Sequence, residues 1–139
     1  MKAPHFLRLA RIDERRFITA CRHGLVHTTW GRITLRFSRD EFRQLGGLLE
    51  RYAEAFSPGS VRDGEIRVTC RLDEDCEVQV GPLVLLLSPT EFEAFLKAVR
   101  EAVHRLDKIL ASGIWDREEA DEDSPSILEQ FRRFSFSRN

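Results

Sequence analysis

Long hydrophobic runs are missing from this sequence of 139 residues. No stretch approaches the roughly 20 apolar residues that a membrane-spanning helix needs, and residues 1–16 lack the apolar core of a signal peptide. Cysteine is also scarce, because three residues without dense spacing do not make a disulfide framework. These absences predict a cytoplasmic protein with reduced thiols.

An excess of charge of one sign is absent too, because 22 basic residues nearly balance 23 acidic ones. The balance hides an asymmetry: residues 1–49 carry a net charge of +6 and residues 50–139 carry −7. Arginine supplies 19 of the basic residues, and its planar fork suits carboxylate and phosphate partners. The overall neutrality gives no bias toward nucleic acid or a membrane surface, so neither is expected as a partner.

Recognisable catalytic patterns are also missing. The sequence has no glycine-rich phosphate loop and no paired carboxylates in a plausible cleft. A Cys–His nucleophile needs an exposed, activated thiolate, but Cys21 lies in an apolar strand pattern in which cysteine is a common core residue. The sequence therefore assigns no catalytic residue and does not predict an enzyme.

What the sequence does contain is an internal repeat. Residues 30–45, WGRITLRFSRDEFRQL, align with residues 80–95, VGPLVLLLSPTEFEAF. The two segments share a glycine, a leucine, a serine and a Glu-Phe pair at matching positions. Upstream, ACRHGLVH at 20–27 resembles TCRLDEDC at 69–76, with one extra residue then required before Gly81.

Each repeat, at about 15–56 and 64–112, predicts short strands followed by one helix. Residues 33–37 alternate between apolar and polar side chains, which is the pattern of a half-buried strand. The Ser-x-x-Glu sequences at 38–41 and 88–91 predict a capping box at the start of each helix. The glycine pair at 46–47 inside the first helix predicts either a close approach of the second helix or a kink.

The predicted fold class is α+β: two tandem ββ(β)α repeats that form an antiparallel sheet with two helices packed on one face, related by a pseudo-two-fold axis. Residues 1–113 are expected to be a single domain made of the two repeats. Residues 114–139 are expected to be an acidic linker followed by a short apolar docking segment.

The strand at 83–87, LVLLL, breaks the alternation and predicts apolar side chains on the outer sheet face at Val84 and Leu86. The C-terminal segment adds further apolar residues that are expected to dock: Ile127, Leu128, Phe131, Phe134 and Phe136. Apolar surface of this kind marks an interaction site unless something covers it. The leading hypothesis is a non-catalytic accessory protein that uses both features to join an oligomer or a larger complex with a protein partner.

Two alternatives remain open. The repeat could bring Cys21, His27, Cys70 and Cys76 together as a Cys3His zinc site, so the expected cofactor is none or zinc. The turn after Cys21 decides the geometry, because a two-residue turn places Val26 opposite Cys21 and a three-residue loop places His27 there. The further alternative is a nucleic-acid-binding face at Arg22, Arg32 and Arg36 with Trp30 nearby, regulated by the acidic tail.

Overall fold

The computed structural model describes residues 5–55, 59–115 and 128. The elements, in chain order, are β1 (Phe6–Asp13), β2 (Arg16–Cys21), β3 (Leu25–Trp30), β4 (Ile33–Ser38), α1 (Arg39–Ala55), β5 (Gly59–Asp63), β6 (Ile66–Cys70), β7 (Cys76–Val80), β8 (Leu83–Leu87) and α2 (Pro89–Ser112). Strands β1 to β4 form one antiparallel sheet, here sheet A, and β5 to β8 form sheet B.

The predicted α+β class and the tandem repeat are confirmed, with two differences in detail. Each repeat begins with a further strand, β1 or β5, and each repeat forms a sheet of its own instead of sharing one. Helix α1 follows β4 directly and carries the chain about 25 Å away from that strand, at 1.5 Å per residue. Strand β5 therefore starts a second sheet.

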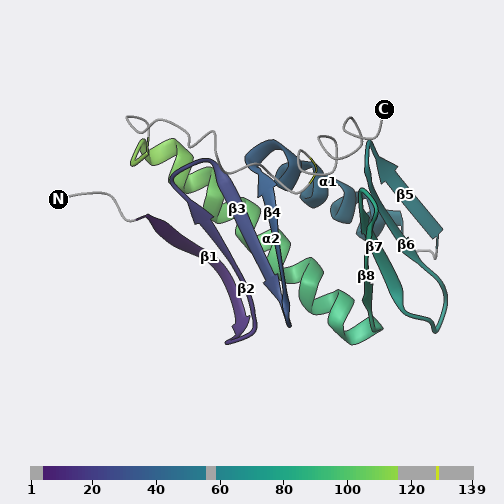
Figure 1. The fold of residues 1–139 in the computed structure, drawn as a ribbon. Coiled ribbons are helices and arrows are strands. Elements are labelled where there is room, and N and C mark those ends of the chain that lie inside the picture. The colour runs from purple at the N-terminus through teal and green to yellow at the C-terminus, as the bar shows by residue number, and fades with distance from the viewer. Residues whose placement is uncertain (1–4, 56–58, 116–127, 129–139) are drawn as a thin grey trace, which may run out of the picture.

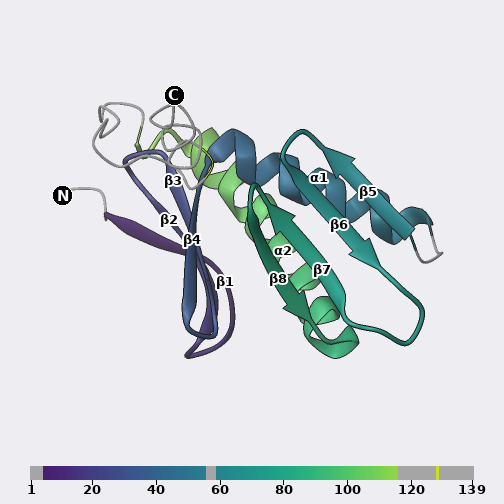
Figure 2. The same ribbon diagram turned by 45° about the vertical axis from the view of Figure 1, so that its right-hand side comes forward.

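The two repeats exchange their helices. Helix α2 packs chiefly on β1 and β2 of sheet A, and α1 packs chiefly on β5 and β6 of sheet B. The helices also contact one another, so both lie against the same side of the pair of sheets (Figures 1 and 2). One hydrophobic core cluster draws on both sheets and both helices. Each sheet keeps an inner face toward the helices and an outer face away from them.

The helices approach each other at Gly46. A Cβ atom there would lie 2.8 Å from Cγ2 of Val103 on α2, whereas nothing lies within 4 Å of the same position at Gly47. Of the two predicted reasons for the glycine pair, close approach therefore holds at Gly46. Helix α1 runs unbroken through both glycines.

The strand ladders fix how the repeats correspond. The amide of Gly31 donates to the carbonyl of Arg15, and the amide of Gly81 donates to the carbonyl of Glu65, at 2.9 Å in both cases. These pairs are related by one constant offset of 50 residues, which also relates the Ser-x-x-Glu sequences. Ala20 therefore corresponds to Cys70, and the predicted alignment of Cys21 with Cys70 is wrong by one residue.

Candidate functional site

Strand β8 places two apolar side chains on the outer face of sheet B. Val84 is 46% exposed and Leu86 is 64% exposed, while Leu85 and Leu87 between and beyond them are buried on the inner face. Strand β8 is an edge of its sheet, with a neighbouring strand, β7, on one side only. The predicted apolar outer surface is present, and no other described residue buries it.

The outer face of sheet A has a different chemistry. The pairing of β1 with β2 and of β3 with β4 places Arg8 and Arg36 at the two ends of one row of outward side chains, with Thr19 and His27 between them. Arg11 lies one row further along β1, opposite Phe17. None of these three arginines has an ion pair within the part of the chain that the structure describes.

His27 lies in the middle of this face and is partly buried. The ring of Phe6 rests against it at 5.7 Å between centroids, with the planes at 66°. Burial, and then the nearby charge of Arg36, hold the pKa of His27 below its usual value. Its Nε2 atom is covered and has no hydrogen-bond partner among the residues that the structure describes.

The four predicted zinc ligands do not come together. Cys70 and Cys76 form a disulfide with each other, and both belong to the hydrophobic core on the inner face of sheet B. Cys21 is a buried free thiol near Phe6 on the outer side of sheet A, and it lies outside that core cluster. Across residues 5–55 and 59–115 no group of three or more His, Cys, Asp or Glu side chains could hold a metal ion.

The one-residue error in alignment explains this outcome. Because side chains alternate between faces along a strand, an error of one residue moves a side chain to the opposite face. The ladder pairs Thr19 with His27 and Ala20 with Val26, so neither predicted register of the turn after Cys21 occurs. The expectation of reduced thiols is also corrected, because two of the three cysteines form a disulfide.

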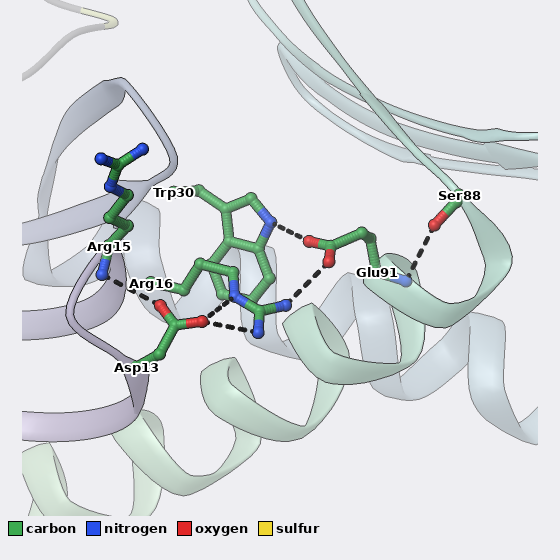
Figure 3. A network of polar contacts seen from close by, with 6 residues as sticks. All are labelled: Asp13, Arg15, Arg16, Trp30, Ser88 and Glu91. Atoms are coloured by element: carbon green, nitrogen blue, oxygen red, sulfur yellow. Dashed lines mark hydrogen bonds and ion pairs between the residues drawn. The ribbon is translucent and has the colours of Figure 1, made fainter.

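A polar network connects the two repeats at the start of α2 (Figure 3). Glu91 accepts a hydrogen bond from Nε1 of Trp30 at 3.0 Å and one from Nη1 of Arg16 at 2.7 Å. Arg16 also pairs with Asp13 at 2.7 Å. Hydrogen bonding to Arg16 lowers the pKa of Asp13, and the carboxylate of Asp13 in turn raises the pKa of Arg16.

This network changes the predicted cap of α2. In repeat one the capping box is complete, because the Ser38 amide donates to Glu41 at 2.7 Å and the Glu41 amide donates to Ser38 Oγ at 3.1 Å. At α2 only the second bond forms, from the Glu91 amide to Ser88 at 3.1 Å. The carboxylate of Glu91 reaches across to sheet A instead.

Trp30 does not serve the predicted nucleic-acid face. Its side chain is 7% exposed on the inner side of sheet A and packs edge-on against Phe95 at 5.1 Å. The guanidinium of Arg16 lies 5.6 Å from the centre of its ring. Trp30 therefore joins sheet A to α2 and is not available for stacking on a ligand.

Phe6, Arg8 and Arg11 are the outer-face residues that the sequence reading missed. Their strand, FLRLARID, does alternate at first, with Leu7 packed against the core and its two neighbours facing out. A register shift between Arg8 and Ala10 then places Leu9 and Ala10 both in the core, which breaks the alternation. The alternation in the first half of the strand was the sequence signal that could have identified these outward residues.

The predicted C-terminal docking segment is described at one position only. Leu128 is 1% exposed and belongs to the hydrophobic core of its own chain. The other predicted docking residues, Ile127, Phe131, Phe134 and Phe136, lie outside the described residues. Trp115, at the end of the preceding described stretch, is also part of this core.

Comparison with protein-family models, curated proteins and solved structures finds no match for this chain. Among the described residues, no helix combines the length and the apolar character needed to cross a membrane.

Proposed function

We propose that this protein is a non-catalytic assembly module that joins a second copy of itself through the outer face of sheet B. The observation that carries the proposal is the exposure of Val84 and Leu86 on β8. Exposed large apolar side chains that lie side by side on one strand face are typical of an interaction surface.

The other repeat supports this interpretation. At the offset of 50 residues, Val84 and Leu86 correspond to Thr34 and Arg36 on β4, which occupy the same place in the ladder. The fold therefore accepts a hydroxyl and a guanidinium at these two positions. Because packing within one chain does not require apolar residues there, a contact outside the chain is the reason that we propose.

The edge strands can be compared by their outward residues. The pairs are Arg8 and Arg11 on β1, Thr34 and Arg36 on β4, Ser60 and Arg62 on β5, and Val84 and Leu86 on β8. Charged residues on exposed edges keep sheets from associating. Strand β8 has no charged residue among these positions.

The surroundings of the apolar pair favour an identical partner. Glu77 lies beside Leu86 in the ladder, and Arg67 lies beyond Gln79, to which it donates a hydrogen bond at 2.7 Å. A surface that carries both signs of charge around an apolar centre can complement itself about a two-fold axis. Leu128 packs within its own chain, so the proposed contact rests on the sheet face and not on that residue.

Sedimentation equilibrium on the full chain tests the proposal. The wild type is expected at about twice the chain mass of 16.1 kDa, and the double variant Val84→Thr/Leu86→Arg, which copies repeat one, is expected at the mass of one chain. Leu72→Arg, at a still more exposed apolar position on a hairpin turn, is the control and should remain dimeric. A monomeric wild type at 100 µM, or a double variant that stays dimeric, would contradict the proposal.

A further inference from the structure

We infer that the outer face of sheet A is a binding surface for single-stranded nucleic acid. The face consists of outward side chains from all four strands: Phe6, Arg8, Arg11, Phe17, Thr19, Cys21, His27, Thr29, Thr34 and Arg36. None of these residues is acidic. The inference concerns a different face from the proposed dimer contact and is independent of it.

The charge on this face is uncompensated within the described chain. Three arginines on the helices have carboxylate partners: Arg43 pairs with Asp107 at 2.7 Å, Arg100 pairs with Glu50, and Arg105 pairs with Glu101. No such partner lies beside Arg8, Arg11 or Arg36 in residues 5–55 and 59–115. Arginines without an ion pair on a face that lacks carboxylates match a polyanion, and arginine is well suited to phosphate.

The arginines are also spread across the sheet. Arg8 lies on β1 and Arg36 lies on β4 in the same row, and three strand spacings of about 4.8 Å separate them by roughly 14 Å. Positive charge therefore lies along both edges of the face, with Thr19 and His27 between. A single strand can contact more than one phosphate across such a span.

The aromatic side chains favour a single strand over a duplex. Phe6 is 59% exposed on this face and is held in place by its edge contact with His27. Unpaired bases stack on exposed rings irrespective of sequence, whereas a duplex keeps its bases stacked inside. Burial, and then the charge of Arg36, lower the pKa of His27, so the positive charge of the face comes chiefly from its arginines.

Fluorescence anisotropy with a labelled 20-nucleotide oligo-dT strand tests the inference on the full chain. Binding should be saturable in 50 mM salt. With three phosphate contacts, the affinity should fall roughly 20-fold between 50 and 200 mM salt. Arg8→Gln/Arg11→Gln should reduce the affinity on the order of tenfold and flatten this salt dependence to about one contact.

Two further variants separate the role of this face from general charge and from folding. Phe6→Ala, at an exposed position, should weaken binding about fivefold or more because a stacking platform is lost. Arg51→Gln/Arg62→Gln removes the same charge from exposed positions outside the face and should leave affinity unchanged. Circular dichroism should show the same fold for all three variants.

Three results would overturn the inference. The first is no saturable binding in 50 mM salt. The second is an equal loss of affinity in the variant pair on the face and in the control pair. The third is binding of polyglutamate or of duplex DNA as tight as that of the single strand, since this would assign the face to acidic peptides or to duplexes. The wild type and Val84→Thr/Leu86→Arg should bind the strand alike, so failure of the dimer proposal leaves this test unaffected.

Discussion

The two adjacent glycines of α1 should respond oppositely to the same substitution. In a helix, alanine is more favourable than glycine by about 1 kcal/mol. At Gly47 a new methyl group meets nothing within 4 Å, so Gly47→Ala should raise the free energy of unfolding by about that amount. At Gly46 the methyl group would lie 2.8 Å from Cγ2 of Val103, well inside the usual carbon–carbon contact of about 3.5–4.0 Å.

The size of the effect at Gly46 follows from how readily Val103 can move. A valine in a helix is held in essentially one rotamer, so relief requires the helices to separate or the side chain to leave that rotamer. Overpacking of this kind costs about 1–3 kcal/mol. After subtraction of the helix-propensity gain of about 1 kcal/mol, Gly46→Ala should lower the free energy of unfolding by about 0–2 kcal/mol.

Urea unfolding followed by far-UV circular dichroism measures both variants, with equal m-values as the check that the unfolding transition is unchanged. Gly46→Ala should fall below Gly47→Ala by about 1–3 kcal/mol. When Val103→Ala is introduced into both variants, most of the difference between their free energies of unfolding should disappear, because it deletes the methyl group that conflicts with the one added at Gly46. If Gly46→Ala is as stable as Gly47→Ala, the helices are not in close contact at this point and the reasoning fails.

Two further predictions concern Glu91 of α2 and His27 of sheet A. Glu91→Gln should lower the free energy of unfolding, measured by urea titration, because it weakens the hydrogen bonds from Trp30 and Arg16. Glu93 lies on the same turn but is exposed and has no such bonds. Glu93→Gln should therefore stay within about 0.5 kcal/mol of wild type. The pKa of His27 in the folded chain lies below its unfolded value of about 6.5, so the unfolded chain binds the extra proton as the pH falls. Thermal stability should therefore fall as the pH drops from about 7.5 to about 5.5. If His27→Gln shows the same dependence of stability on pH, other groups cause it.

The features that the sequence predicted correctly are those carried by local patterns. Ser38 and Glu41 cap α1 as their spacing requires. The alternation of side-chain direction along a strand placed the apolar Val84 and Leu86 of β8 outward. Neighbours within a turn or a strand determine each of these features, so no long-range information was needed.

The features that were missed depend on register and on distant contacts. A similarity of two letters, Cys-Arg, aligned Cys21 with Cys70, and the resulting one-residue error inverted the faces of the predicted ligands. Nothing near Glu91 in the chain indicates that its carboxylate binds Trp30 and not the cap. For the capping box of repeat one, the position that corresponds to Trp30 is Val80, which has no hydrogen-bond donor on its side chain, and there the box is complete.

The exchange of helices between the sheets also determines when the chain can finish folding. Strands β1 to β4 pair with their neighbours through short turns, and hairpins of this kind form within microseconds. The helix that covers much of their inner face begins only at Pro89. At roughly 5–20 residues per second of synthesis, α2 is completed some seconds after sheet A. During that time apolar side chains of the inner face of sheet A, such as Leu9 and Ile18, are in contact with water. The nascent chain is therefore most exposed to aggregation after the first sheet has formed and before the last helix has been made.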